Sequence, residues 1–255
     1  MIFDTHAHYD DEAFDEDREE LLDRMKEAGI DYVVNVGANM ASSRKTIELC
    51  EQYSFLYGAV GIHPSDAQEM NDEALKELHQ MAGHDKIVAI GEIGLDYYWP
   101  EPAKEVQKKA LEMQVALAKE VKLPIAIHSR DAARDTADML SSLHGGDCGG
   151  VIHCFSYTKE MAREFLNMGF YIGIGGVVTF KNSRKLKEAV QYIPMDRIVL
   201  ETDCPYLAPT PYRGKRNSSL YLPYVAEEIA RLKGISYEEV LAATMTNAKK
   251  MYRIS

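Results

Sequence analysis

The stretch IFDTHAHYDD, residues 2–11, decides between the two α/β folds that this chain could adopt. It begins as an apolar strand and then places Asp4, His6 and His8 at alternate positions. Side chains alternate between the two faces of a strand, so all three should point the same way. A doubly wound open sheet would have a glycine-rich phosphate turn after this first strand, and the stretch contains no glycine. It therefore favours a closed barrel.

Eight short apolar runs along the chain have the composition of buried strands. Most are nearly continuous in Val, Ile, Leu and Gly, which is typical of parallel strands covered on both faces. The runs are residues 2–6, 32–37, 56–63, 87–94, 124–129, 150–155, 171–176 and 198–203. Helical patterns alternate with them. Eight such pairs predict an α/β fold of the (β/α)8 TIM-barrel type, formed by residues 1–255 as a single domain.

The clearest helical pattern covers residues 103–121, where apolar residues recur every three or four positions. Asp131 is the predicted N-cap of the helix that follows the fifth strand. Two further patterns, over residues 217–233 and 236–252, come after the last predicted strand. They predict an extra helix at the C-terminus of the barrel.

The composition is that of a globular protein, with 46% hydrophobic residues and a formal net charge of −11. This charge disfavours loose binding to nucleic acid through clustered Lys and Arg, although ions bound at a site can reverse the local field. The sequence contains no apolar run of membrane-spanning length and does not begin like a secretion signal. Its four cysteines lack the spacing of a disulfide framework, so we expect reduced, buried thiols and a cytoplasmic protein.

Ionisable side chains stand at or near the ends of six predicted strands. The carboxyl ends of barrel strands form the active-site face, so these side chains should meet at one mouth. Neutral imidazole and carboxylate are good ligands for Zn²⁺, Mn²⁺, Co²⁺ or Ni²⁺. One ion needs three or four ligands, whereas a larger set with a bridging carboxylate suits two ions ~3.5–4 Å apart. The candidate metal ligands are His6, His8, Glu92, His128, His153 and Asp203.

A single histidine at a strand end is more often a hydrogen-bonded structural residue than a metal ligand. Several strand ends carry such residues, which makes a metal site the better interpretation, because packing of a core does not require ionisable groups at one end of the barrel. Buried charges are costly unless they are paired or bound to a metal. We therefore predict a metal centre at the mouth.

Seven motifs give the chain a resemblance to a known family. FDTHAH, GIHP, GEIGLDYY, PIAIHSRDA, VIHCFS, ETDCPYLAP and RGKRN occur in this order from residue 2 towards the C-terminus. They resemble the TatD-related metal-dependent DNases of the amidohydrolase-like barrel superfamily. The resemblance implies a distorted (β/α)8 barrel in which one ion is held by His6, His8, Glu92 and Asp203. It implies a second ion held by Glu92, His128 and His153, so that Glu92 bridges the two.

The sequence departs from this family's pattern in the basic loop. Many relatives continue that loop as Arg-Gly-Lys-x-Asn-Glu-Pro, whereas here Ser218 and Ser219 replace the Glu-Pro pair. The departure leaves the predicted metal ligands unchanged. It puts in doubt the role of that glutamate at the rim, and either serine is a candidate to cap the next helix.

The predicted centre favours a hydrolase in which a metal-bound hydroxide attacks phosphorus in line. Asp203 is the candidate to orient the attacking water and accept its proton, and Glu92 is the second catalytic candidate. Two divalent ions would outweigh the charges of these carboxylates, which reconciles the acidic chain with a phosphate substrate. His63 and Arg130 are candidates to donate hydrogen bonds to phosphate oxygens. The alternative for Arg130 is an ion pair with a neighbouring aspartate.

Other residues near the strand ends are candidates for supporting roles. Asp4 is predicted to lie behind the ligands and to orient an imidazole. Asp96 is predicted either to orient a ligand or a sugar hydroxyl, or to shape a turn. Arg213 and Lys215 belong to a basic cluster that either binds backbone phosphates or forms a solvated loop. Residues 97–99, Tyr-Tyr-Trp, either stack bases of a single strand or pack on the barrel rim.

The resemblance implies a deoxyribonuclease that uses Mg²⁺ and degrades DNA from a 3′ end, with a preference for single strands. Imidazole ligands are soft for Mg²⁺, so the ligand set by itself favours a transition metal. The same centre could hydrolyse an ester or amide, as an aminoacyl-tRNA deacylase or a small-molecule amidohydrolase does. A non-catalytic scaffold is disfavoured, because every predicted ligand is present. DNA is therefore the predicted partner, without a membrane or an organic cofactor, and the sequence leaves the oligomeric state open.

Overall fold

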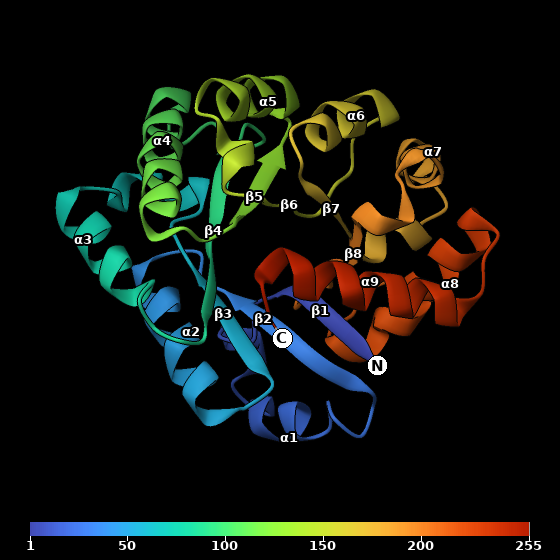
Figure 1. The fold of residues 1–255 in the computed structure, drawn as a ribbon. Helices are drawn as coiled ribbons and strands as arrows, with labels where there is room; N and C mark the ends of the chain where they lie inside the picture. The colour runs from blue at the N-terminus through green and yellow to red at the C-terminus, as the bar shows by residue number, and fades with distance from the viewer. Residues whose placement is uncertain (255) are drawn as a thin grey trace.

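The computed structural model describes residues 1–254 and contains an eight-stranded parallel sheet in the order β1 to β8 (Figure 1). Each strand pairs with its neighbours in the sequence, and helices alternate with the strands around the outside. The (β/α)8 TIM barrel that the sequence predicts is therefore confirmed. The strands are β1 (Ile2–Ala7), β2 (Ile30–Val36), β3 (Leu56–Val60), β4 (Ile87–Asp96), β5 (Ile125–Arg130), β6 (Gly150–Ile152), β7 (Tyr171–Ile174) and β8 (Ile198–Leu200).

The outer layer consists of α-helices and short 3-10 segments. The α-helices are α1 (Arg18–Asp23), α2 (Met40–Gln52), α3 (Asp72–Met81), α4 (Lys104–Val121), α5 (Ala133–Ser142), α6 (Lys159–Asn167), α7 (Arg184–Tyr192), α8 (Leu222–Lys233) and α9 (Tyr237–Tyr252). The 3-10 segments are η1 (Glu12–Phe14), η2 (Pro64–Glu69), η3 (Gly145–Asp147), η4 (Gly176–Thr179), η5 (Met195–Arg197) and η6 (Ser219–Tyr221). Helix α4 agrees with the prediction to within one residue, and α8 and α9 are the two helices predicted after the last strand.

The predicted N-cap of α5 is wrong. Ala132 occupies the N-cap position and makes no side-chain capping bond. Asp131 lies one residue earlier, in the left-handed conformation with φ of 52°. Its backbone turns the chain out of β5, and this turn removes its carboxylate from the cap.

The barrel closes between β8 and β1 without a regular ladder of hydrogen bonds among the residues described. A single bridge joins Ala7 to Cys204, beyond the end of β8. Nearby, the Thr5 hydroxyl donates to the carbonyl of Leu200 at 2.9 Å. Side chains thus replace part of the backbone pairing at this seam.

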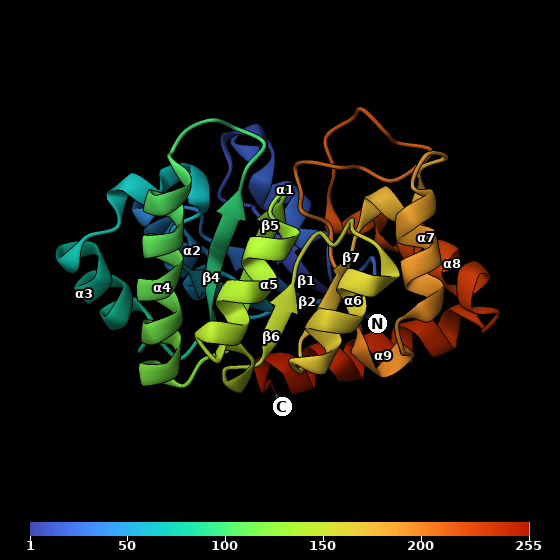
Figure 2. The same ribbon diagram turned by 90° about the horizontal axis from the view of Figure 1, so that it is seen from above.

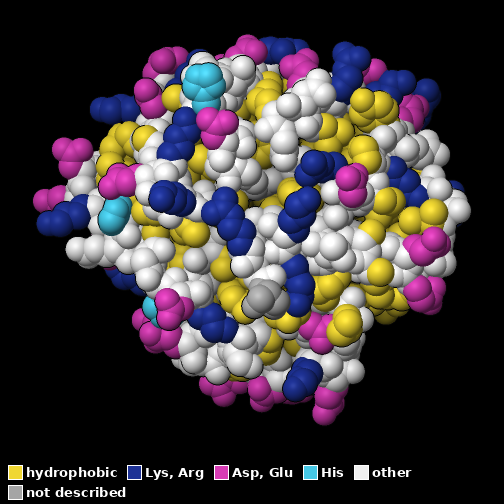
Figure 3. All heavy atoms as spheres, viewed as in Figure 1, with side chains coloured by type: hydrophobic (Ala, Val, Ile, Leu, Met, Phe, Trp, Pro, Cys, Tyr) yellow, Lys and Arg dark blue, Asp and Glu magenta, His cyan; other side chains and the backbone are white. Residues whose placement is uncertain are grey.

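Helix α9 covers the end of the barrel at which the strands begin. Its residues Ala248, Met251 and Tyr252 pack in one apolar cluster with side chains from the strand faces. The Tyr252 hydroxyl also donates to the carbonyl of Thr5 at 2.9 Å. Figure 1 looks onto this end, and Figure 3 shows a continuous layer of side chains across it. In Figure 2 the strands point upward, away from α9, and the loops after β4 and β8 rise at the opposite end, the mouth.

Four strands end at least two residues earlier than predicted. The sequence extends the third, sixth, seventh and eighth strands to residues 63, 155, 176 and 203, but β3, β6, β7 and β8 end at Val60, Ile152, Ile174 and Leu200. His63, His153 and Asp203 consequently lie in loops just beyond their strands. In two of these loops the chain turns through a left-handed residue, Cys154 with φ of 46° and Asp203 with φ of 57°.

The four cysteines are free, as predicted. Cys50, Cys148 and Cys204 are buried, whereas Cys154 is partly exposed. No helix within residues 1–254 is both long enough and apolar enough to cross a membrane.

Candidate metal centre

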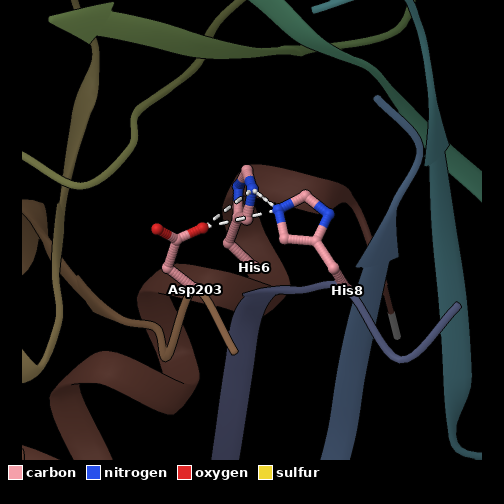
Figure 4. A group of neighbouring side chains, drawn as sticks. All are labelled: His6, His8 and Asp203. Atoms are coloured by element: carbon pink, nitrogen blue, oxygen red, sulfur yellow. Dashed lines mark hydrogen bonds and ion pairs between the residues drawn. The ribbon is translucent and has the colours of Figure 1, made fainter. Parts of the chain in front are cut away.

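The structure brings all six predicted metal ligands together at the mouth of the barrel. His6 lies on β1 and His8 follows it, Glu92 is on β4 and His128 is on β5. The other two ligands, His153 and Asp203, stand in the loops after β6 and β8. Figure 4 shows the imidazoles of His6 and His8 converging on the carboxylate of Asp203.

Four donor atoms of this set lie close together, and His6, His8 and Asp203 among them form a group with all ligand atoms within 4.8 Å of one another. The Nε2 atoms of His6 and His8 are 3.2 Å apart, and they lie 3.4 and 3.5 Å from Glu92 Oε2. Their distances to Asp203 Oδ1 are 3.9 and 3.4 Å. Ligand atoms bound tetrahedrally at ~2.1 Å from an ion stand roughly 3.4 Å from one another. The distances of the two imidazole nitrogens from each other and from each carboxylate oxygen therefore suit ligands of one divalent ion.

The other oxygen of Glu92 faces a second group of imidazoles. Glu92 Oε1 is 2.7 Å from His128 Nδ1, 2.8 Å from His153 Nε2 and 3.7 Å from His63 Nε2. The two oxygens of one carboxylate thus point into two separate clusters of nitrogen donors. This is the arrangement expected of a bridging ligand in a two-metal site.

Hydrogen bonds on the far side of two of the rings, those of His8 and His128, orient the other ring nitrogen towards the clusters. His8 Nδ1 lies 2.7 Å from the carbonyl of Val36, which can only accept, so Nδ1 carries a proton and Nε2 is the nitrogen that faces the carboxylates. His128 Nε2 lies 3.1 Å from Asp96 Oδ2, which leaves Nδ1 to face Glu92. Such partners fix the tautomer and the direction of a metal-ligating histidine.

The charges of the site favour a cation. The neighbouring imidazoles of His153, His63 and His6 hold the pKa of Glu92 well below its usual range, although burial opposes this. Against the effect of burial, the hydrogen bond to Asp203 and the charge of Glu92 raise the pKa of His8 to about 10, so a bound ion has to displace the Nε2 proton of this ring. Burial and the adjacent His153 lower the pKa of His6 to about 4, so this ring is neutral, as a ligand must be.

Asp96 supports a predicted ligand, in line with one of its two expected roles. While Oδ2 contacts His128, Oδ1 accepts the backbone N–H of Tyr98 at 2.9 Å. Gln107 holds the backbone of the same residue, because its side-chain oxygen accepts the N–H of Asp96 at 2.8 Å. One buried carboxylate therefore joins a candidate metal ligand to the loop after β4.

The expected role of Asp4 is not what the structure shows. Its carboxylate is fully buried and accepts bonds from the hydroxyls of Ser219 and Thr202, at 2.6 and 2.7 Å. It also accepts the backbone N–H of Thr202 at 3.0 Å and that of His6 at 3.3 Å. None of its bonds within the described chain goes to an imidazole. Asp4 instead ties β1 to the chain beyond β8, because the hydroxyls beside it are nearer than any ring nitrogen.

Glu201 is a residue of the site that the sequence analysis missed. It is fully buried, accepts the backbone N–H of Cys154, and lies 3.8 Å from His153 Nδ1. Burial raises its pKa to about 8. Gly173 on β7 makes room for it, since a Cβ there would lie 2.1 Å from Glu201 Oε2. Its position two residues before Asp203 was the available signal, by the alternation that identifies His6 and His8.

His63 is placed to donate a hydrogen bond at the mouth. Its Nδ1 accepts the backbone N–H of Ser65 at 3.1 Å, so the proton of the neutral ring is on Nε2. Burial and the neighbouring His128 lower the pKa of His63 to about 3, which keeps it neutral. His63 also forms, with Glu92 and His128, a group of possible ligand atoms that all lie within 4.8 Å of one another.

The predicted basic cluster is spread over different partners. Arg216 makes a paired contact with Asp17 at 2.7 and 2.6 Å and so fastens the loop after β8 to the loop after β1. Arg213 lies over the ring of Phe180, 4.3 Å from its centroid. Lys215 lies 6.0 Å from the ring centroid of Tyr212. Arg216 is thus a structural residue, whereas Arg213 and Lys215 form no ion pair with the described residues.

The serines that replace the family's Glu-Pro pair do not cap a helix. Ser218 occupies the N-cap position of η6 but makes no side-chain capping bond. Ser219 uses its hydroxyl to donate to Asp4 and to contact the Tyr9 hydroxyl at 2.8 Å. The expectation of a serine cap is therefore wrong, because the buried carboxylate of Asp4 takes the hydroxyl of Ser219.

Comparisons with known proteins agree with this fold and site. A sequence model of the family described as TatD related DNase matches residues 3–253. The chain is 47% identical over 255 residues to an uncharacterized metal-dependent hydrolase of Bacillus subtilis strain 168, covering all of both chains. It is 34% identical over 257 residues to the 3′-5′ ssDNA/RNA exonuclease TatD of Cronobacter sakazakii, covering 98% of this chain and 97% of that protein. The crystal structure of a TatD homologue from Escherichia coli K12 superposes with a TM-score of 0.94 at 30% identity, covering 100% of this chain and 98% of the other.

Proposed function

The chain belongs to the TatD-related DNase family, whose members include metal-dependent hydrolases, and from that premise we propose that it degrades single-stranded DNA as a 3′-5′ exonuclease. The observation that supports this best is the position of Glu92, whose two oxygens face two different groups of imidazoles. A carboxylate between two ligand groups suits a pair of divalent ions, which is a common device for phosphodiester hydrolysis. The printed name of the Cronobacter sakazakii relative supports the direction and the single-stranded substrate.

We infer that one ion is held by His6, His8, Glu92 and Asp203, and that the second is held by Glu92, His128 and His153. Imidazole nitrogens with carboxylates favour Zn²⁺, Mn²⁺, Co²⁺ or Ni²⁺ over Mg²⁺ in affinity, and Mg²⁺ would serve at higher concentration. When bound, the ions supply a water of lowered pKa and the positive charge that a phosphate requires.

The side chains of the mouth divide the remaining work. Asp203 accepts the proton of the attacking water, since its side chain is 17% exposed whereas that of Glu92 is 5% exposed. His63 donates its Nε2–H to a phosphate oxygen. Arg130, which is exposed and stands two residues beyond His128, places a guanidinium beside the same phosphate.

A groove at the mouth end of the barrel supports a polymeric substrate. It has a volume of about 770 Å³ and lies where α6 and α7 begin. Lys159, Arg184 and Lys185 line it together with two glutamates, so cations are in the majority. Phe180 also lines it, under the guanidinium of Arg213. Backbone phosphates of a bound strand would contact these cations, in a chain that is acidic overall.

The experiment compares wild type with Asp203→Asn and with Tyr192→Ala as a matched control, because Tyr192 ends α7 far from the mouth. A 5′-labelled single-stranded oligonucleotide is incubated with Mn²⁺ or Mg²⁺, beside an aryl ester and an aminoacyl-tRNA. We expect wild type and Tyr192→Ala to shorten the DNA stepwise from its 3′ end and Asp203→Asn to leave it intact. DNA left intact by wild type with every divalent metal, alongside hydrolysis of either ester, would assign the centre to carboxylic esters instead.

We propose in addition that residues 1–255 act as one domain, in the cytoplasm. The family model spans nearly the whole chain, which supports a single unit. The four cysteines are free, which fits a reducing compartment.

A further inference from the structure

Two aromatic side chains project from the loop after β4. Tyr98 is 53% exposed and Trp99 is 58% exposed, and their ring centroids are 4.8 Å apart in an edge-to-face arrangement. The preceding Tyr97 differs, because it is half-buried and its hydroxyl donates to Asp135 at 2.8 Å. The sequence leaves two roles open for residues 97–99, stacking on bases or packing on the barrel rim. Tyr97 packs on the rim, whereas Tyr98 and Trp99 are exposed.

Exposed apolar side chains of this size are concentrated at the mouth. Within residues 1–254, seven large apolar side chains are exposed. Four of these are Tyr98 and Trp99 after β4, and Tyr206 and Leu207 after β8. In a barrel of eight strands in sequential order, β4 and β8 stand opposite each other, and Figure 2 shows both loops rising beyond the mouth. Exposed apolar groups gathered around a polar centre mark a ligand site.

Short contacts connect the Tyr98–Trp99 pair to the candidate metal centre. Asp96 accepts the backbone N–H of Tyr98 with one oxygen and contacts His128 with the other. The guanidinium of Arg130 lies 3.8 Å from the centroid of the Tyr98 ring, and it forms no ion pair with any described carboxylate. An aromatic face and an unpaired cation therefore stand beside the place where the scissile phosphate would bind.

We propose that Tyr98 and Trp99 form a stacking site for an unpaired nucleobase next to the scissile phosphate, and that Tyr206 receives a base on the opposite side of the mouth. The proposal rests on the proposed function, since it places a nucleic acid strand across the metal centre. Every base has an aromatic face, so such a site accepts any sequence. Bases paired within a duplex are covered by their neighbours, and the site therefore selects single strands.

The positions of the rings agree with a site that exists before the substrate arrives. The Tyr98 backbone is fixed by Asp96, and its ring is covered on one side by Arg130. Across the mouth, the Tyr206 hydroxyl donates to Asp11 at 3.0 Å, which holds that ring in place. Rings held in this way lose little freedom when a base stacks on them.

Trp99 is the single tryptophan of the chain, so its fluorescence reports on this site directly. The full chain carrying Asp203→Asn, which we expect to leave DNA intact, is titrated in Mg²⁺ with a ten-nucleotide thymidine oligomer. The control oligomer has the same phosphates but abasic tetrahydrofuran units. We expect the thymidine oligomer to quench the fluorescence and to bind at least fivefold more tightly than the abasic one. Equal binding of both oligomers would overturn the proposal, because the phosphates alone would then explain it.

Kinetics provide a second readout, with Trp99→Ala, Trp99→Phe and the control Tyr192→Ala. Loss of one base stack weakens binding by about 5- to 150-fold, and the KM of Trp99→Ala for the thymidine oligomer should rise by that factor with kcat unchanged. Trp99→Phe should restore most of the affinity, and Tyr192→Ala should stay within twofold of wild type. DNA cleavage that is indifferent to Trp99→Ala overturns the stacking site and leaves the proposed function standing. Base-dependent quenching of the fluorescence without any DNA cleavage would support the stacking site and overturn the proposed function.

Discussion

Removal of the Asp4 carboxylate should weaken the seam of the barrel rather than the metal centre. In Asp4→Ala, the backbone N–H of Thr202 loses its acceptor, and so does the N–H of His6, whose bond is already long at 3.3 Å. The two hydroxyls have other partners nearby, since Thr202 Oγ1 is 3.3 Å from the carbonyl of His6 and Ser219 Oγ is 2.8 Å from the Tyr9 hydroxyl. The main cost is therefore one or two buried amides without an acceptor.

The magnitude follows from these contacts. A buried donor left without a partner costs about 1–3 kcal/mol, and the loss of a buried carboxylate offsets part of that, so we expect a net cost of about 2–3 kcal/mol. In a chain of this size each kcal/mol lowers Tm by about 2–4 °C, which gives a decrease of about 4–12 °C. Asp4→Asn keeps an oxygen for the Thr202 amide and should lose about 2–4 °C, or ~1 kcal/mol.

Thermal denaturation and zinc titration together test this reasoning. Both Asp4 variants and wild type are melted in EDTA, and their Zn²⁺ affinities are then measured by competition with a chelator. We expect the order of Tm to be wild type, Asp4→Asn, Asp4→Ala, with Zn²⁺ affinities within threefold of one another. An unchanged Tm in Asp4→Ala would refute the role of Asp4 in stabilising the seam between β1 and the chain beyond β8. A tenfold loss of Zn²⁺ affinity in Asp4→Asn would show instead that Asp4 orients an imidazole, as the sequence first suggests.

Three further results are expected. Glu201→Gln should lower Zn²⁺ affinity by about 10- to 100-fold with little change in Tm, because the carboxylate supports His153 from behind, and unchanged affinity would contradict that role. Gly173→Ala should lower both Tm and Zn²⁺ affinity, because the added Cβ would collide with the Glu201 carboxylate. The control Gly83→Ala should change neither, because its added Cβ comes no closer than 3.3 Å to a neighbouring atom. Zn²⁺ at a thousandfold excess over its Kd should stabilise wild type by about 4 kcal/mol in thermal melts. The double variant His6→Ala/His8→Ala should gain less, and an equal gain would show that the ion binds elsewhere.

The sequence predicts well which side chains meet at the mouth, because their positions depend on features of short range. His6 and His8 share a face of β1 by the alternation of a strand, and the parallel barrel brings the remaining strand ends to the same mouth. Glu201 obeys the same alternation with Asp203 within the predicted strand 198–203, but nothing in the sequence shows that its carboxylate is buried behind His153. A buried acid beside a glycine on the next strand becomes visible only when β7 and β8 are paired.

The roles of the loop residues could not be predicted, because loops bring together residues that are distant in the sequence. Asp4 finds Ser219 across 215 positions, and no local pattern indicates that pair. The basic cluster looks uniform in sequence, yet Arg216 forms an ion pair with Asp17 while Arg213 stacks on Phe180. The outcome depends on which acidic or aromatic side chain the fold places within reach of each cation.

The seam between β8 and β1 also determines when the protein can become functional during its own synthesis. Thr5 must wait for Leu200, which is made 195 residues later, and for Tyr252, made 247 residues later. At about 5–20 residues per second, this delay lasts about 10–40 s on the ribosome for Leu200 alone. During that interval β1 has one partner strand, and its histidines have no aspartate beside them. The first of the two proposed ion sites, which needs Asp203 beside His6 and His8, can therefore form only after residue 203 has been made, late in synthesis.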